Sequence, residues 1–337
     1  FAIYDKEENS LFIARDRFGI NPLYYFIDED KFIFASEMKA IMAYKIPKNM
    51  DEASLQMYLH FNYIPSPDTI LKNVKKLPPA SWCRIQNSGL KIQNYYQINS
   101  EPTTLKYENA GIELKKIIEN SVHKRMIADV PLGCFLSGGI DSSIISAIAA
   151  KHTKHLKTFS IGYKDEGYFD ETYYANIMAK KIQSEHTVFS LTNDDLFGNL
   201  HSVLDYIDEP FADSSALAVH ILSMHTRKHV KVALSGDGAD EIFGGYNKHS
   251  AELRARNGGV RASLVKSSKH MLKILPKSRN TKLGNKVRQL QKFSEGMGMN
   301  EQERYWRWAG FADEKEIEKI IATDFTGFRR RKKEILK

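Results

Sequence analysis

A glycine- and serine-rich turn between an apolar strand and a helix constrains this chain more than any other feature. The segment SGGIDSS at 137–143 directly follows the apolar run GCFLS and directly precedes the helical pattern SSIISAIAA. Glycines let a backbone approach an anion closely, and a helix N-terminus supplies positive potential. The segment lacks the ending of a Walker loop and the glycine spacing of dinucleotide folds. It predicts a pyrophosphate-binding turn; the alternative is a tight turn in which Asp141 or Ser142 only caps the helix.

The residues around this turn alternate between strand and helix patterns. The runs GCFLS, KTFSIGY, HTVFSL and VKVALS are apolar without clean alternation, as expected for strands covered on both faces. Helical spacing predicts helices near 105–126, 142–152, 170–183, 193–207 and 214–229. Alternating units of this length predict a doubly wound parallel sheet of the α/β class, with ligands bound where its strands end.

Residues 1–96 follow a different pattern. The runs LFIARD, PLYYFI, KFIFAS, SWCRI and LKIQNYY are short and β-like, and turn residues separate them. They predict an antiparallel sheet that begins with a hairpin, interrupted by helices at 37–43 and 52–61, the second capped by Asp51. The polar segment NSEPTT at 99–104 is the expected linker.

A second glycine-rich loop, SGDGADEIFGGY at 235–246, follows the strand VKVALS. Parallel strands end at one edge of a sheet, so we expect its carboxylates, Asp237, Asp240 and Glu241, beside the first turn. Acids beside a phosphate loop would repel a nucleotide unless a hard cation intervened. We therefore expect Mg²⁺ held by Asp141 and Asp240, against the alternative of a solvated acidic turn.

Composition and charge exclude several classes of protein. No run of about eighteen apolar residues occurs, and the opening FAIYDKEENS has no signal-peptide pattern, so we expect neither membrane spanning nor export. Two cysteines far apart in sequence favour a reducing cytoplasm and buried thiols. The chain has a net charge of +8, and residues 251–337 hold 22 Lys or Arg against 10 Asp or Glu. We expect solvated helix faces there and no nucleic-acid partner.

These motifs resemble the asparagine synthetase family, glutamine-hydrolysing class B type, within the wider group of ATP pyrophosphatases. The resemblance rests on RDRFGINPLYY at 15–25, ASEMKAI at 35–41, DVPLGCFLSGGIDSS at 129–143 and SGDGADEIFGGY at 235–246. It implies the end of an Ntn-type glutaminase sandwich at 1–98, the C-terminal part of a glutamine amidotransferase domain. An ATP-pyrophosphatase domain of the adenine nucleotide alpha hydrolase type would follow at 105–337.

The resemblance also implies a reaction. ATP and aspartate would form β-aspartyl-AMP and pyrophosphate, and ammonia from glutamine would then displace AMP to give asparagine. Asp237 stands where some members have Glu, Asp240 matches an acid that works with magnesium, and Glu241 could manage protons of the amine; these three are the expected catalytic residues. The residues expected to hold ATP are Phe135, Ser137, Gly138, Gly139, Asp141, Ser142, Ile161, Ser235 and Gly236.

Two departures from the family pattern limit what we expect of this chain. The family's glutaminase nucleophile is a cysteine at the mature N-terminus, whereas this chain begins with Phe1. The family's C-terminal lysine at the adenylation site has no counterpart before Lys337, and Lys332 and Lys333 are poor substitutes. We therefore expect a piece of a longer protein that binds nucleotide but has no glutaminase activity and weak or no synthesis.

Several alternatives stay open from the sequence. The acid could differ from aspartate, as in another amide synthetase of the same superfamily. The chain could also be a non-catalytic nucleotide-binding relative, or one that contacts RNA through its basic region. The segment DEPFAD at 208–213 could approach the pocket for the substrate carboxylate or only form a turn and helix cap. The resemblance leaves a homodimer open.

Overall fold

The computed structural model describes residues 1–86, 89–258, 271, 275–276, 278 and 281–337. Contacts divide the chain into two compact units. The first unit contains Phe1–Pro102, Asp205–Asp213 and Ala309–Lys337, and the second contains Thr103–Leu204 and Ser214–Trp308. Both units are therefore discontinuous in sequence. Part of the basic region that the sequence analysis singled out lies outside the described residues.

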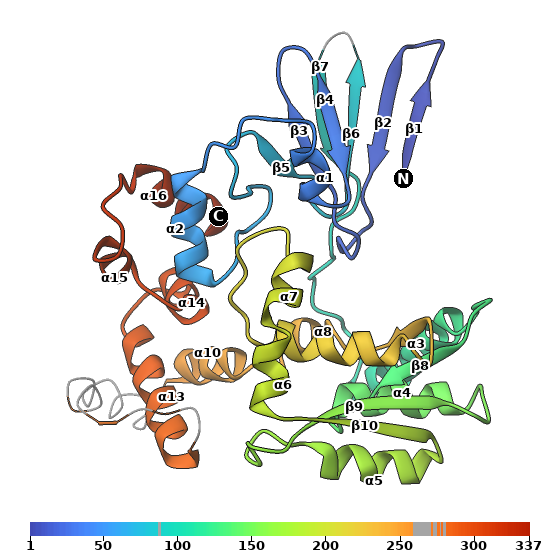
Figure 1. Ribbon diagram of the computed structural model, residues 1–337. Helices are drawn as coiled ribbons and strands as arrows, with labels where there is room; N and C mark the ends of the chain where they lie inside the picture. The colour runs from blue at the N-terminus through green and yellow to red at the C-terminus, as the bar shows by residue number, and fades with distance from the viewer. Residues whose placement is uncertain (87–88, 259–270, 272–274, 277, 279–280) are drawn as a thin grey trace. The chain divides into compact units, whose positions relative to one another are not determined.

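The first unit holds two antiparallel sheets (Figure 1). The predicted opening hairpin is confirmed, because Ala2 pairs with Ile13 and Asp5 with Ser10. One sheet has the order β1-β2-β6-β7 and the other β4-β3-β5. Their strands are β1 Ala2–Asp5, β2 Ser10–Ala14, β3 Tyr24–Ile27, β4 Phe32–Ala35, β5 Val74–Lys76, β6 Ser81–Gln86 and β7 Gly89–Asn94.

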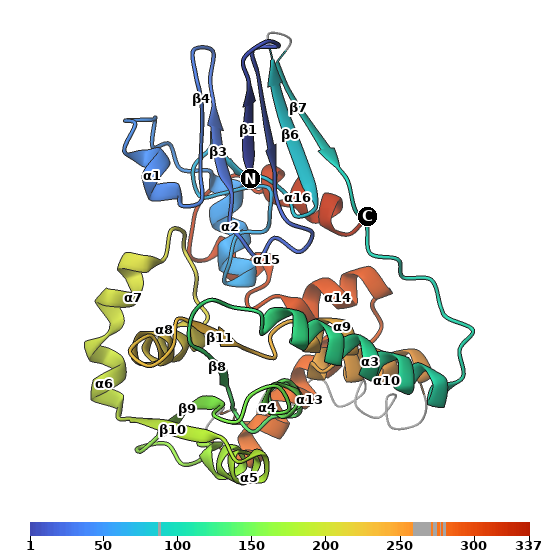
Figure 2. The ribbon, with the colours of Figure 1, turned by 90° about the vertical axis from the view of Figure 1, so that its right-hand side faces the viewer.

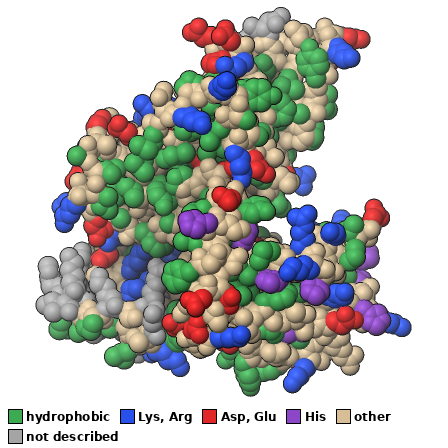
Figure 3. Space-filling view, viewed as in Figure 1, with side chains coloured by type: hydrophobic (Ala, Val, Ile, Leu, Met, Phe, Trp, Pro, Cys, Tyr) green, Lys and Arg blue, Asp and Glu red, His purple; other side chains and the backbone are tan. Residues whose placement is uncertain are grey.

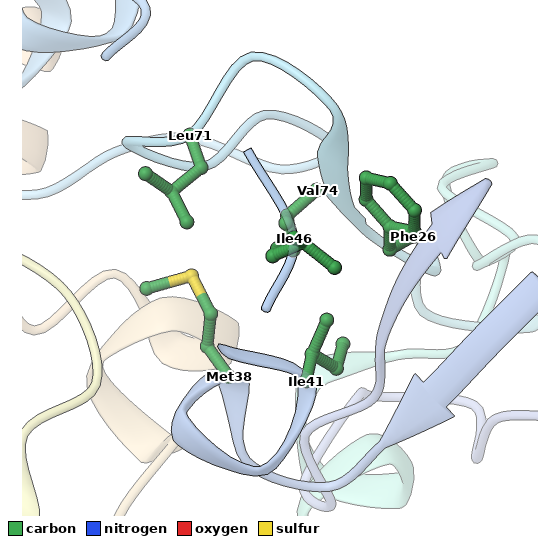
Figure 4. Close-up of a cluster of buried hydrophobic side chains, with 6 residues drawn as sticks. All are labelled: Phe26, Met38, Ile41, Ile46, Leu71 and Val74. Atoms are coloured by element: carbon green, nitrogen blue, oxygen red, sulfur yellow. The ribbon is translucent and has the colours of Figure 1, made fainter. Parts of the chain in front are cut away.

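Four helices belong to the first unit: α1 Met38–Met42, α2 Glu52–Phe61, α15 Glu314–Glu318 and α16 Thr326–Ile335. The predicted cap of α2 is confirmed, because the Asp51 side chain accepts a hydrogen bond from the Ser54 N–H. One face of α1 fills a core with side chains from β3, β5 and the intervening loops (Figure 4). The buried members of that core are Phe26, Met38, Ile41, Ile46, Leu71 and Val74.

The second unit is built on a parallel four-stranded sheet in the order β10-β9-β8-β11. The predicted α/β class with a parallel sheet is confirmed. The two central strands, β8 and β9, are largely buried, which explains their apolar runs without alternation. The strands are β8 Leu132–Phe135, β9 Lys157–Tyr163, β10 Glu185–Leu191 and β11 Val232–Leu234.

Helices cover both faces of this parallel sheet. On one face Cys134 packs with buried side chains of α3 and α4, and Leu136 packs with Ala175 and Ala179 of α5. The helix α8 lies on the opposite face, as Figure 1 shows. The helices are α3 Tyr107–Arg125, α4 Ile140–Ala150, α5 Thr172–Ile182, α6 Asn193–Gly198, α7 Leu200–Tyr206, α8 Ser215–Thr226, α9 Ala239–Phe243, α10 Asn247–Asn257, α13 Lys282–Gly296 and α14 Glu301–Ala309.

One predicted helix is divided in the structure. The expected helix at 193–207 forms as α6 and α7, which meet at Asn199. Gly198 directly precedes the break, and glycine lowers the stability of a helix interior, so the pattern of apolar residues was a poor guide at this point. Among the described residues, no helix is long and apolar enough to cross a membrane.

Candidate nucleotide site

The two glycine-rich loops leave neighbouring strands of the parallel sheet. Leu132 pairs with Val232 and Cys134 with Leu234, so β8 and β11 run side by side in the same direction (Figure 2). The chain passes from β8 to β9 and β10 in one direction and then returns to place β11 on the other side of β8. This reversal is a topological switch point, where open α/β sheets bind ligands beyond the carboxyl ends of their strands.

The turn after β8 has a preformed set of hydrogen bonds. The Ser137 and Ser142 hydroxyl oxygens lie 3.0 Å apart, and the Gly139 N–H donates to the Ser137 hydroxyl at 3.2 Å. The Ser142 hydroxyl also lies 3.2 Å from the Gly139 carbonyl, to which it can donate. Ser142 is buried, whereas Ser137 and Gly139 are exposed. The hydroxyl groups of the turn therefore hold its shape, and two of its residues face solvent.

Glycine is required inside this turn. Gly138 has a φ of +88°, and a Cβ there would come within 2.5 Å of the Ala175 backbone nitrogen. The helix α4 begins directly after Gly139 and has no side-chain hydrogen bond at its N-cap. Its first N–H groups are thus not capped by a side chain, which is the arrangement that favours an anionic ligand.

The loop after β11 lies directly against the first turn of α4. A Cβ on Gly236 would come within 2.8 Å of both the Asp141 Cβ and the Ser142 backbone nitrogen. The neighbouring Ser235 hydroxyl donates to an Asp237 carboxylate oxygen at 2.8 Å. The structure therefore brings Gly236 together with Asp141 and Ser142, as the sequence analysis expected for these two loops.

The acids that follow lie on the short helix α9. Asp240 and Glu241 are in its first turn, and the chain then folds back so that the Gly245 N–H donates to the Asp240 carbonyl at 3.0 Å. The Tyr246 hydroxyl donates to a Glu241 carboxylate oxygen at 2.5 Å. This hydrogen bond lowers the pKa of Glu241 and raises the pKa of Tyr246 to about 12. Glu241 is therefore held as an ionised, oriented carboxylate.

The two residues expected beside an adenine ring share one face of the sheet. Phe135 pairs with Phe159, and Ile161 lies two residues further along β9, so the three side chains point to the same side. That side is covered by α8, because His225 of α8 stacks on Phe189, the register partner of Ile161, at a centroid distance of 4.9 Å. Phe135 and Ile161 are both partly exposed.

A metal site is not formed by protein side chains alone in the part of the chain that the structure describes. No group of three or more His, Cys, Asp or Glu side chains is gathered there. Asp141 and Asp240 are both partly exposed. The assignment of these two residues to a cation stays a prediction.

Both cysteines are free and buried. Burial raises the pKa of each thiol to about 11, so both are protonated near neutral pH. The prediction that Cys83 and Cys134 are small core groups is confirmed.

Two aromatic residues near the loops were missed in the sequence analysis. Tyr174 of α5 lies beside the turn, where its Cβ would be 2.6 Å from a Cβ on Gly138. Tyr246 ends the motif SGDGADEIFGGY, but no local pattern predicts its hydrogen bond to Glu241. The pairing depends on the left-handed Gly244, which turns the chain back toward α9.

A parallel sheet with a glycine- and serine-rich turn at its switch point defines the second unit as an open α/β structure. The family model described as asparagine synthase matches residues 113–332, and the glutamine amidotransferase domain model matches residues 1–96. The chain belongs to the asparagine synthase family.

Three curated relatives show the extent of the similarity. Asparagine synthetase [glutamine-hydrolyzing] 1 of Bacillus subtilis is 36% identical over 82% of this chain and 44% of its own length. A putative asparagine synthetase of Methanocaldococcus jannaschii is 38% identical over 74% of this chain and 49% of its own length. A putative asparagine synthetase of Mycobacterium bovis is 36% identical over 76% of this chain and 40% of its own length. The chain thus spans a little under half the length of these relatives.

Proposed function

We propose that the protein containing this chain is a glutamine-hydrolysing asparagine synthetase. It would activate aspartate with ATP as β-aspartyl-AMP, release pyrophosphate, and pass glutamine-derived ammonia to the activated acid. The observation that carries this proposal is the contact of Gly236 with Asp141 and Ser142, since it joins both family motifs at one sheet edge. Residues 1–98 would belong to the glutamine amidotransferase domain and residues 105–337 to the ATP-pyrophosphatase domain.

The turn after β8 would hold the departing pyrophosphate. Attack of a carboxylate on the α-phosphorus needs little proton transfer but strong stabilisation of the leaving group. Uncapped N–H groups of α4 and the hydroxyls of the turn are suited to that task. The residues of this proposed nucleotide site are Phe135 and Ile161 at the adenine, Ser137, Gly138, Gly139, Asp141 and Ser142 at the phosphates, and Ser235 and Gly236 in the second loop.

The donor set at the site fits Mg²⁺ better than a metal that needs an all-protein cage. Magnesium commonly binds one or two carboxylates together with substrate phosphates and water. Asp141 and Asp240 would supply those carboxylates, in line with the lack of a larger ligand cluster among the described residues. The ion would neutralise charge on the phosphates of ATP.

The second half of the reaction would use the acids of the second loop. An amine that attacks an acyl-adenylate must lose a proton, and an ionised carboxylate can accept it. Asp237 is exposed, and Glu241 is oriented by Tyr246. We assign them, with Asp240, to catalysis.

We further propose a cytoplasmic location, which the two free thiols suit. A homodimer remains a hypothesis, which light scattering of the purified protein tests. On the face shown in Figure 3, Lys and Arg side chains are interspersed with Asp and Glu side chains. We do not propose a nucleic-acid partner.

The identity of the acid substrate is tested by replacing aspartate with other acids. AMP formation from Mg-ATP and ammonium is measured in the complete gene product with aspartate, glutamate, and longer or N-acylated acids. Stimulation by aspartate alone is the expected result. Stimulation by another acid and not by aspartate would overturn the assignment to asparagine while leaving the nucleotide site in place.

A further inference from the structure

The ammonium group of Lys248 lies over two tyrosine rings of the second unit. Its Nζ atom is 5.0 Å from the centroid of the Tyr246 ring and 6.0 Å from the centroid of the Tyr305 ring. Lys248 is the second residue of α10, which begins at Asn247, and Tyr305 is on α14. Cations are attracted to the faces of aromatic rings, so Lys248 connects the end of the second loop with α14.

The place of Lys248 in its helix is not explained by the stability of that helix. The residue lies in the first turn of α10, where the helix macrodipole disfavours a positive charge. That turn contains no acidic residue that could offset the charge, and the side chain of the N-cap residue, Tyr246, makes no capping hydrogen bond. The last turn, which favours cations, already holds Arg254 and Arg256. A contact outside the helix therefore accounts better for a lysine at position 248.

A charged contact one turn further along holds α10 on α14. Glu252 follows Lys248 by four residues and so lies on the same face of α10. Its two carboxylate oxygens accept hydrogen bonds from Nε and Nη2 of Arg304, each at 2.7 Å. Arg304 directly precedes Tyr305 on α14 and is only 8% exposed. The face of α10 that carries Lys248 is therefore fixed against α14, and the two helices lie side by side in Figures 1 and 2.

Tyr246 connects this contact to the acids of the second loop. Its hydrogen bond to Glu241 raises the pKa of the Tyr246 hydroxyl, and so do the negative charges of Asp240 and Asp237. All three proposed catalytic carboxylates therefore act on one hydroxyl group. Like charges repel, so a cation beside the ring offsets part of the cost of gathering them. The hydrogen bond from Tyr246 and then the charge of Lys248 lower the pKa of Glu241.

We propose that Lys248 is a positioning residue for the amidation step, which holds the Tyr246 ring against α14 and thereby orients the Glu241 carboxylate for the incoming ammonia. The inference rests on the proposed function, in which Glu241 takes part in the second half of the reaction. Lys248 itself touches no substrate in this account. Formation of the acyl-adenylate should not depend on it, because that step uses the turn after β8.

The test measures two reactions of the complete gene product: aspartate-dependent exchange of pyrophosphate into ATP, and asparagine synthesis from aspartate and ammonium. Lys248→Met removes the charge, and Lys248→Arg keeps it. We expect Lys248→Met to lower the kcat of synthesis about tenfold and to change the exchange rate less than about twofold. Lys248→Arg should retain both reactions. The control is Lys282→Met, which replaces an exposed lysine in the first turn of α13 and should also retain both.

A double variant separates positioning through Tyr246 from any other role of Lys248. If Lys248 acts through the hydrogen bond between Tyr246 and Glu241, Lys248→Met should lower synthesis less than about twofold further once Tyr246→Phe has removed that bond. An independent tenfold loss in the Tyr246→Phe background would overturn the inference.

Two other results would also contradict it: undiminished synthesis by Lys248→Met, or an equal loss of exchange and synthesis. Should Lys248→Met fail to fold, Lys248→Gln serves as the neutral variant in the same comparison. Failure of the wild type to exchange pyrophosphate into ATP with aspartate would instead refute the proposed function.

Discussion

Gly236 lies so close to Asp141 that a Cβ at position 236 would come within 2.8 Å of the Asp141 Cβ and 2.9 Å of its carbonyl carbon. The two loops therefore meet through backbone atoms, where a side chain cannot move aside. This contact makes one site out of two motifs that are far apart in the sequence.

Gly236→Ala should separate the loops. We expect pyrophosphate release to fall about a hundredfold, because small misplacements of catalytic groups have effects of that size. Gly111→Ala is the matched control, since a Cβ there would meet no atom within 4 Å apart from the backbone of its own helix and its chain neighbours. Steady-state pyrophosphate assays of both variants check the prediction, and equal activity of the two would show that the loop contact is not needed.

Gly138→Ala should destabilise the fold more than Gly238→Ala does. Both glycines have nearly the same left-handed φ, +88° and +89°, so each substitution should cost ~1 kcal/mol through backbone strain. Only at Gly138 would the new Cβ overlap the Ala175 backbone, which should add ~1–3 kcal/mol. Urea unfolding of both variants measures the difference, and similar free energies of unfolding would argue against close packing of the turn.

The ion pairs of Glu252 predict an acid-dependent stability. Its carboxylate accepts hydrogen bonds from Arg304 and Arg256, and these lower its pKa from 4.5 to about 2 in the folded state. A carboxyl whose pKa is lower in the folded than in the unfolded protein stabilises the fold at pH values above its unfolded-state pKa. This contribution disappears as the pH falls from 4.5 toward 2. In thermal unfolding, the melting temperature of the wild type should therefore exceed that of Glu252→Gln at higher pH, and the difference should shrink across that interval.

Glu301→Gln is the control for that series. Glu301 also pairs with Arg256, but its side chain is 62% exposed, so the pair should contribute little. A constant difference between wild type and Glu252→Gln from pH 6 to pH 2 would contradict the role given to Glu252.

Tyr246→Phe should impair the second half-reaction more than the first. The substitution removes the hydrogen bond that orients Glu241 and lets the pKa of that carboxyl rise toward its ordinary value. We expect ammonium-dependent asparagine synthesis to fall about tenfold or more while aspartate-dependent exchange of pyrophosphate into ATP is retained. Tyr305→Phe serves as the control, because the Lys248 ammonium lies over the rings of both Tyr246 and Tyr305. A larger loss in the exchange reaction would place Tyr246 in the first step instead.

The local features of the chain could be predicted because they depend on neighbouring residues. The Asp51 cap, the opening hairpin and the strand–turn–helix at 132–150 all follow from short-range patterns. The strand β5 was missed because its three residues, VKK, include two lysines and offer no alternating pattern. Its lysine at position 76 forms an ion pair with Glu209, which no local pattern encodes.

The arrangement of site residues was predictable only in part. Parallel strands dictate that the loops after β8 and β11 share an edge, so the meeting of Gly236 with Asp141 could be anticipated. The bond between the hydroxyls of Ser137 and Ser142 could not, because both were expected to face a ligand. The membership of Asp205–Asp213 in the first unit depends on buried tertiary contacts, which sequence periodicity does not report.

The central claim is that one site at the edge of the parallel sheet activates aspartate with ATP. The most direct test measures pyrophosphate and asparagine formed from Mg-ATP, aspartate and ammonium by the complete gene product, by its Asp141→Ala variant, and by Asp194→Ala on α6 as a control. We predict equal amounts of the two products from wild type and control and loss of both in Asp141→Ala. Undiminished formation of both products by Asp141→Ala would contradict the account.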